Sequence, residues 1–119
     1  MKDFIVDSTS FNGIAVIYPQ GYLNNIVGEK LEKECNAFLD KGINKIVLDF
    51  TKTEFINSIG ISILLSIIEK MEASKGTLCF TSMSNLHEDI FEMLGLTKYV
   101  NVFPNKEEAI KKLKNGLAK

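Results

Sequence analysis

The stretch IVLDFTKTEFINSIGISILL, residues Ile46 to Leu65, decides how this chain folds. It starts with an apolar run that ends at Phe50, passes through a short polar link, and continues from Ser58 as a long, nearly all-apolar helical pattern. A buried strand followed directly by a helix is the repeating unit of a parallel α/β sheet. The stretch also places Ser58 at a helix start, where backbone N–H groups and the helix dipole favour a phosphoryl group.

Length and composition indicate one ordinary globular domain. The chain has 119 residues, which suffice for one hydrophobic core but are too few for two. Hydrophobic residues make up 45% and charged residues 24% of the chain. Fourteen basic and fifteen acidic residues leave a net charge of −1, so the chain lacks the basic field that nucleic-acid binding requires. We therefore treat residues 1–119 as a single domain that does not bind nucleic acid.

Charge placement and cysteine usage predict a cytoplasmic protein. Lys2 and Asp3 lie where a signal peptide would have an apolar run. The apolar stretch from Ile59 to Ile68 is about half of the ~20 residues needed to cross a bilayer, so we expect no membrane insertion. Cys35 and Cys79 lie singly within apolar patterns, which favours buried reduced thiols over a disulfide or a zinc site.

Hydrophobic periodicity predicts the element order ββαβαβαβα. The dipeptide Asn12-Gly13 predicts a type I′ turn between the first two strands. Alternation of strands and helices after that hairpin predicts an α/β fold: a mostly parallel mixed sheet of about five strands with an antiparallel N-terminal edge strand, and about four helices. The predicted strands are 4–8, 14–19, 44–50, 77–81 and 99–103, and the predicted helices are 27–39, 58–74, 85–94 and 106–117.

The helix that starts at Ser58 carries a narrow polar stripe. Ser58, Ser62, Ser66 and Glu69 follow helical spacing, and nearly every other position is apolar. Two interpretations stay open: a buried helix with a thin solvent edge, or a helix whose exposed isoleucines dock a partner. Ser58 also has two interpretations. It is either the helix cap or, if Asn57 is the cap, a residue at the first helical position with a free hydroxyl.

The sequence contains no motif by which the chain could catalyse a reaction on its own. Glycine-rich phosphate loops and the nucleophile elbow are absent. His87 has no metal-ligand partner at a suitable spacing, and we expect it to be solvated near the start of its helix. On that helix we expect one apolar stripe, formed by Leu86, Ile90, Phe91 and Leu94. Asp49, inside an apolar strand, is the one acid of interest. We therefore predict no enzymatic activity, no catalytic residue, no metal site and no cofactor.

Three motifs give the chain a resemblance to a known family. Residues 49–51 (DFT) end a strand and are followed by 55–56 (FI) and 57–60 (NSIG). Residues 21–24 (GYLN) follow the second strand, and residues 91–96 end a helix with Leu-Gly-Leu. The pattern covers nearly the whole chain. It resembles the STAS domain, named for sulfate transporters and anti-sigma factor antagonists, and in particular the small single-domain bacterial antagonists.

This resemblance implies a regulatory binding protein. In such antagonists the unmodified protein binds a switch kinase that doubles as an anti-sigma factor, and the sigma factor is released. The kinase then phosphorylates the serine that corresponds to Ser58, the antagonist lets go, and a phosphatase resets the switch. A homodimer is left open. By this resemblance, the partner-binding residues are Asn24, Asn57, Ser58, Ile59, Gly60, Ile61 and Ser62.

At two positions where the family pattern has acidic residues, this chain has asparagine. We therefore consider three functions. Asn57 precedes the serine and Asn24 lies on the neighbouring loop, each without the negative charge of a carboxylate. The preferred function is a phospho-switched antagonist. The second is a STAS scaffold or transport-complex subunit that binds its partner without phosphorylation. The third is a small-ligand-binding α/β domain with a pocket at the carboxyl strand ends, formed by Asn24, Asp49, Asn57 and Ser58.

Overall fold

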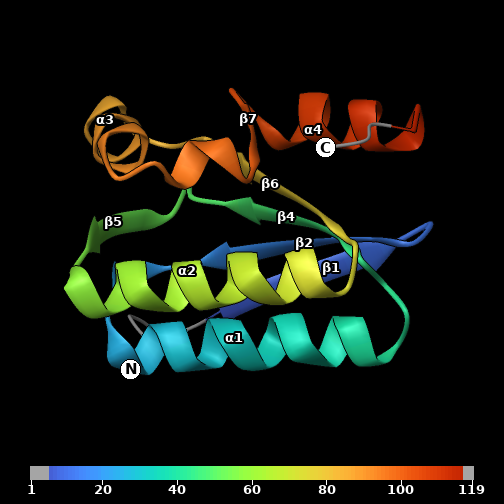
Figure 1. Ribbon diagram of the computed structural model, residues 1–119, viewed down its shortest axis with the longest axis horizontal. Helices are drawn as coiled ribbons and strands as arrows, with labels where there is room; N and C mark the ends of the chain where they lie inside the picture. Colours follow the sequence, from blue (N-terminus) through green and yellow to red (C-terminus); the bar gives the residue numbers. More distant parts are fainter. Residues whose placement is uncertain (1–5, 117–119) are drawn as a thin grey trace.

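A five-stranded mixed sheet lies at the centre of the computed structural model, which describes residues 6–116 (Figure 1). The elements in chain order are β1 (Val6–Phe11), β2 (Ile14–Pro19), β3 (Gly21–Leu23), α1 (Asn25–Asp40), β4 (Lys45–Asp49), β5 (Thr53–Ile56), α2 (Ser58–Ala73), β6 (Thr77–Thr81), α3 (Asn85–Met93), η2 (Leu96–Lys98), β7 (Asn101–Phe103) and α4 (Lys106–Lys114). The strand order is β1-β2-β4-β6-β7, with β1 antiparallel to β2 and the other neighbours parallel. The predicted fold class is therefore confirmed.

The predicted boundaries lie close to the observed ones. Strands β2 and β6 have the predicted bounds, and α2 ends one residue early, with Ser74 as its C-cap. The hairpin turn is also as predicted, because Asn12 and Gly13 have φ values of 53° and 79°, both in the left-handed region that a type I′ turn requires. Two predicted ends are wrong: β1 continues beyond Ser8 to Phe11, and α4 ends at Lys114, with Asn115 as its C-cap, rather than near Leu117. The predicted start at Phe4 lies outside the described residues.

Side chains that alternate along the strands build one core on each face of the sheet. On one face Ala15, Ile17, Ile46 and Leu48 belong to the core that includes residues of α1 and α2. On the other face Val16 and Val47 pack with residues of α4. Figure 1 shows this arrangement, with α1 and α2 below the sheet and α4 above it. Within residues 6–116, no helix is both long and apolar enough to span a membrane.

A second, two-stranded parallel sheet pairs β3 with β5, and the sequence did not predict it. Leu23 pairs with Ile56, and the Gly21 N–H donates to the Lys52 carbonyl at 2.8 Å. The sequence pattern here indicates only a polar link, because three or four residues are too few to establish a two-residue period. This small sheet carries the chain from the ends of β2 and β4 to the starts of α1 and α2.

Helix α3 follows its predicted apolar stripe only in part. Phe91 is buried and Ile90 is half-buried, as the stripe requires. The two ends of the stripe are wrong, because Leu86 and Leu94 are 67% and 54% exposed. His87, expected to be solvated, is only 8% exposed, and Phe91 one turn later is fully buried. The physical reason is aromatic packing: Phe91 makes an edge contact with the ring of Phe50, 6.1 Å between centroids, and that contact sets which face of α3 points inward.

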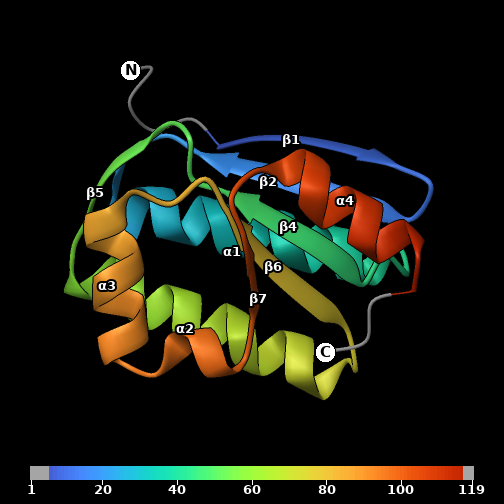
Figure 2. The ribbon, with the colours of Figure 1, turned by 90° about the horizontal axis from the view of Figure 1, so that it is seen from above.

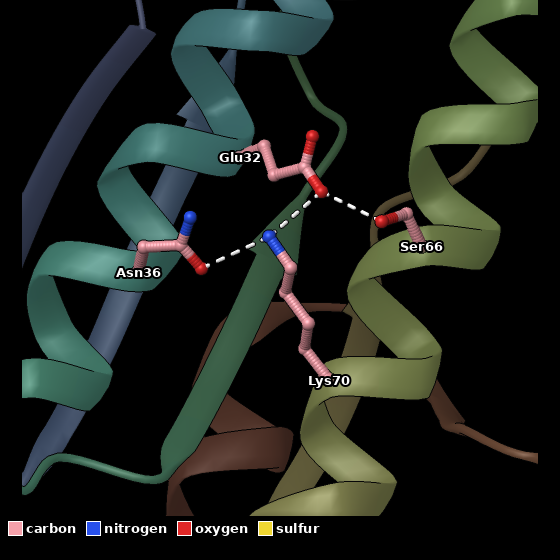
Figure 3. A network of polar contacts seen from close by, with 4 residues as sticks. All are labelled: Glu32, Asn36, Ser66 and Lys70. Carbon is pink, nitrogen blue, oxygen red and sulfur yellow. Dashed lines mark hydrogen bonds and ion pairs between the residues drawn. The ribbon is translucent and has the colours of Figure 1, made fainter.

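A network of polar contacts joins α1 and α2 along their outer edge (Figure 3). The Ser66 hydroxyl donates to Glu32 Oε2 at 2.6 Å, and Lys70 Nζ lies 2.9 Å from the same oxygen. Lys70 also donates to Asn36 Oδ1 at 3.2 Å. Hydrogen bonds from Ser66 and then from Lys70 hold the pKa of Glu32 below its ordinary value of 4.5. Glu32 therefore stabilises the helix pair in its charged form.

We expect Glu32→Gln to lower the free energy of unfolding by about 0.5–1 kcal/mol at neutral pH, because a half-exposed charged contact is lost. A carboxyl group with a lowered folded-state pKa stabilises the fold above its unfolded-state pKa and loses this effect as the pH falls through the folded-state pKa. The difference between wild type and variant should therefore begin to decrease near pH 4.5 and disappear only below the lowered folded-state pKa of Glu32. Urea unfolding at several pH values measures it. Glu29→Gln, exposed on the same helix, is the control, and an equal loss in both variants would contradict the role of Glu32.

Candidate functional site

The predicted site residues meet where β3 and β5 end. Leu23 and Ile56 are paired at the carboxyl ends of two parallel strands, so the residues that follow them, Asn24 and Asn57, lie at one edge. Each asparagine begins a helix. The Asn24 side chain caps α1 by accepting the N–H group of Ile26 at 3.0 Å. The small sheet thus brings together two segments that are far apart in the sequence.

Asn57, and not Ser58, is the cap of α2. The Asn57 side-chain oxygen accepts the Gly60 N–H at 2.8 Å. Ser58 is the first residue of the helix and is exposed, and its hydroxyl makes no hydrogen bond within the described chain. The N–H groups of Ser58 and Ile59 belong to the first helical turn, which lacks intrahelical acceptors. The site therefore presents a free hydroxyl at the positive end of the helix dipole.

Gly60 is buried against the backbone of β3. A Cβ at this position would lie 2.2 Å from the Leu23 carbonyl oxygen, so no side chain fits. The same carbonyl oxygen accepts the Asn57 N–H at 3.2 Å. The close backbone approach that the glycine permits is therefore internal to the chain. Any contribution of Gly60 to partner binding comes through the position that it gives to Ser58.

The start of α2 presents a mixed apolar and polar surface. Ile59 is 50% exposed and Ser62 is exposed, whereas Ile61 is half-buried. One turn further, Leu65 is 40% exposed. Of the two interpretations of this helix, exposed apolar side chains beside the polar stripe fit the docking surface better than a thin solvent edge does.

An apolar groove adjoins this surface, and the sequence did not predict it. It has a volume of about 500 Å³ and lies between β5 and α3. Tyr22, Phe55, Leu86 and Ile90 supply apolar walls, and Asn57 lies at the end next to Ser58. Figure 2 shows α3 beside β5, close to the start of α2. Aromatic residues in a segment that otherwise reads as a polar link were the one signal in the sequence.

Asp49 has a structural role and lies outside the region formed by Asn24, Asn57 and Ser58. Its carboxylate accepts hydrogen bonds from the Thr51 N–H at 3.0 Å, the Thr81 hydroxyl at 2.7 Å and the Ser82 hydroxyl at 3.1 Å. Burial opposes its ionisation, but these hydrogen bonds outweigh burial and hold the pKa of Asp49 below its ordinary value. The carboxylate thereby ties the end of β4 to the end of β6.

The pocket required for a small-ligand site does not unite the predicted residues. Asp49 lines a polar cleft of about 450 Å³ near the start of α4, together with Tyr18 and Lys106. Asn24, Asn57 and Ser58 do not line this cleft. The four residues that the third interpretation requires are therefore split between two regions.

The cysteines are buried thiols, as predicted. Cys35 and Cys79 are both free and buried. Burial raises the pKa of each thiol to about 12, so neither is a ready nucleophile or metal ligand at neutral pH. Among residues 6–116, no group of three or more His, Cys, Asp or Glu side chains is arranged to hold a metal ion.

The family model of the STAS domain matches residues 6–109, which include both paired strands and the complete Ser58 site. The chain belongs to the STAS domain family. The family resemblance predicted from the motifs at residues 49–60, 21–24 and 91–96 is thereby confirmed.

Similar proteins of this family are named anti-sigma factor antagonists. BtrV of Bordetella bronchiseptica, a proposed anti-sigma factor antagonist, is 27% identical over 106 residues, which cover 89% of this STAS chain and 91% of BtrV. A crystal structure of a proposed antagonist from Thermotoga maritima has a TM-score of 0.82 at 21% identity and covers 91% of this chain and 93% of that one. SpoIIAA from Bacillus in its phosphorylated form has a TM-score of 0.74 at 21% identity, covering 92% and 99%. The two structures establish the common fold.

Two glycines of this STAS domain make a matched test of the backbone contact. We expect Gly60→Ala to destabilise the fold by about 2 kcal/mol, because overpacking costs ~1–3 kcal/mol and a helical alanine recovers up to ~1 kcal/mol. Gly28→Ala should stay within about 1 kcal/mol of wild type, since its Cβ meets mainly the flexible end of the Ile63 side chain. Denaturant unfolding of both variants measures the difference. Equal losses of unfolding free energy in the two variants would show that the backbone at Leu23 moves aside as readily as the Ile63 side chain.

Proposed function

We propose that this STAS domain is an anti-sigma factor antagonist whose binding to a switch kinase is controlled by phosphorylation of Ser58. The partner is a serine kinase that doubles as an anti-sigma factor, and a phosphatase restores the unmodified protein. The chain itself supplies a surface and an acceptor hydroxyl, whereas ATP and the catalytic groups belong to the partner. This cycle takes place in the cytoplasm.

The free hydroxyl of Ser58 is the observation that carries the proposal. Because Asn57 caps α2, the Ser58 side chain is not needed for the fold and points to solvent at an exposed helix start. An acceptor for phosphoryl transfer needs this accessibility. The exposed side chains of Ile59 and Ser62 surround the hydroxyl with a surface suited to partner binding.

The chemistry of the switch follows from charge. The kinase transfers the γ-phosphoryl group of ATP to Ser58 Oγ, the hydroxyl proton leaves, and ADP is released. The new group adds about −1.5 to −2 charges, and the first-turn N–H groups of α2 favour an anion there. The fold therefore tolerates the phosphate, but a partner packed on Ile59 would have to desolvate it. Binding is lost while the domain stays folded.

Binding without phosphorylation is the alternative, and the two amide caps favour it. Asn24 and Asn57 are neutral and are committed to capping α1 and α2. If a carboxylate at either position orients the serine for the kinase, this chain is phosphorylated slowly or not at all. It then acts as a STAS scaffold or as a subunit of a transport complex.

Phosphosite mapping of the intact protein from its own cells separates the two functions. We expect a single phosphate, located on Ser58, and none on the Ser58→Ala variant. Ser58→Asp should fold normally and bind the kinase about ten- to a hundredfold more weakly in calorimetric titrations, whereas Ser58→Ala should bind like wild type. An unmodified Ser58 under every growth condition, with equal affinity of both variants, would favour the scaffold.

Asn57→Asp tests the role of the missing carboxylate. Aspartate is as good a helix cap as asparagine, so the fold should be unchanged. We expect the partner kinase to phosphorylate Ser58 severalfold faster in this variant, because a carboxylate restores the family pattern next to the hydroxyl. Initial rates of phosphate incorporation measure the effect. Asn24→Asp is the matched variant on the other cap, and an unchanged rate in both would exclude the amides as the cause of slow phosphorylation.

A further inference from the structure

The apolar walls of the groove between β5 and α3 are not used in the proposed phosphorylation switch. Phe55 is 64% exposed and Leu86 is 67% exposed, and they face the groove from opposite sides. Tyr22, 45% exposed, packs edge-on against Phe55 with 6.1 Å between the ring centroids. Exposed aromatic side chains that support each other in this way are typical of a protein-binding surface.

The elements that form the groove are uniformly acidic. Glu54 lines the groove from β5, and Glu88, Asp89 and Glu92 are exposed on α3. Asp89 follows Leu86 by three residues, so these two side chains share one face of the helix. β3, β5 and α3 contain no lysine or arginine. The groove therefore combines apolar walls with one carboxylate in its lining, Glu54, and three more on the exposed surface of α3.

His87 does not offset this charge. It lines the groove and is buried, and burial lowers the pKa of its imidazole, which keeps the ring neutral at neutral pH. The local surface thus stays negative, although the whole chain has a net charge of only −1.

We propose that this groove docks a cationic amphipathic segment of a partner protein. The apolar side chains of the segment enter between Phe55 and Leu86, and its lysine or arginine side chains face the carboxylates. This is the complementarity by which an amphipathic helix binds a hydrophobic groove with a charged rim. The site lies beside Ser58 but is separate from it, since Asn57 lines the groove and Ser58 does not.

Other occupants fit the groove less well. Anionic lipid surfaces and nucleic acids would be repelled by the carboxylates. A second copy of the chain offers lysines on α4, but Ala109 and Leu113 of that helix are fully buried and cannot enter a groove. A partner protein that carries exposed apolar and basic residues on one segment satisfies both features.

Calorimetric titration of the unmodified full chain with a helical leucine–lysine peptide tests the proposal. The leucines occupy one face of the peptide, and a comparison peptide has glutamate in place of every lysine. We expect the leucine–lysine peptide to bind at least about tenfold more tightly. Amide chemical shifts should change at Tyr22, Phe55, Leu86 and Ile90. Equal affinity for both peptides, no binding of either, or shift changes confined to another face would overturn the proposal.

Two variants separate the groove from general charge attraction. Phe55→Ala should weaken peptide binding at least about tenfold at physiological salt, because an aromatic anchor is lost. Met93→Ala is the matched control, since Met93 is 81% exposed on α3 but does not line the groove, and it should change the affinity less than about twofold. Both side chains are largely exposed, so both variants should fold, and circular dichroism checks this. Unchanged binding by Phe55→Ala would overturn the proposal.

Ser58→Asp distinguishes the groove from the phosphorylation switch. An added negative charge near the groove should leave the affinity for the cationic peptide unchanged within about threefold or make it tighter, whereas the proposed kinase complex is weakened by the same substitution. A loss of peptide binding in Ser58→Asp would mean that the peptide occupies the Ser58 surface, and the groove proposal would fail. Binding of the peptide by a chain that is never phosphorylated would support the groove even if the switch is absent.

Discussion

The carbonyl oxygen of Leu23 is the contact on which the site depends. It accepts the Asn57 N–H and lies so close to Gly60 that no side chain fits between them. This contact fixes the end of β3 against the start of α2. Because Asn57 is held there, its side chain is in place to cap the helix, and the chain turns so that Ser58 faces solvent. One backbone contact thus determines both the start of a core helix and the exposure of the proposed phosphorylation site.

The charge differs between the helix starts next to this contact and the neighbouring groove between β5 and α3. The helix starts are capped by the neutral amides of Asn24 and Asn57, so the positive ends of the helix dipoles are not compensated by carboxylates. The carboxylates lie instead on β5, where Glu54 lines the groove, and on the exposed surface of α3. A partner therefore meets a surface that favours an anion at Ser58 and a cation next to it. Such a pattern supports orientation and specificity more than raw affinity.

The sequence was sufficient for elements with a strong apolar signal. The continuous apolar run in β4 indicates a buried strand, the sixteen residues of α2 establish a helical period, and the mixed sheet follows from the order of such elements. The β3–β5 pair was not predictable, because its strands are too short to show a period. In α3 the burial of Phe91 was predicted, but the exposure of Leu86 and Leu94 and the burial of His87 were not, because a contact between Phe91 and the distant Phe50 sets which face of the helix points inward. The groove depends on both of these tertiary features, so only its aromatic residues were visible in the sequence.

The Ser58 motif could be recognised from the sequence because the fold and the proposed function depend on different residues of one short segment. Asn57 and Gly60 face inward, where the cap and the Leu23 contact restrict each to very few residue types. Ser58, Ile59 and Ser62 face outward or half outward, and their side chains make no hydrogen bond on which the helix depends. A switch requires this division, because a group that gains a charge must change binding without unfolding the domain that presents it. Ser58 and Gly60 together make the segment recognisable as STAS, and the other outward residues are free to determine which partner it binds.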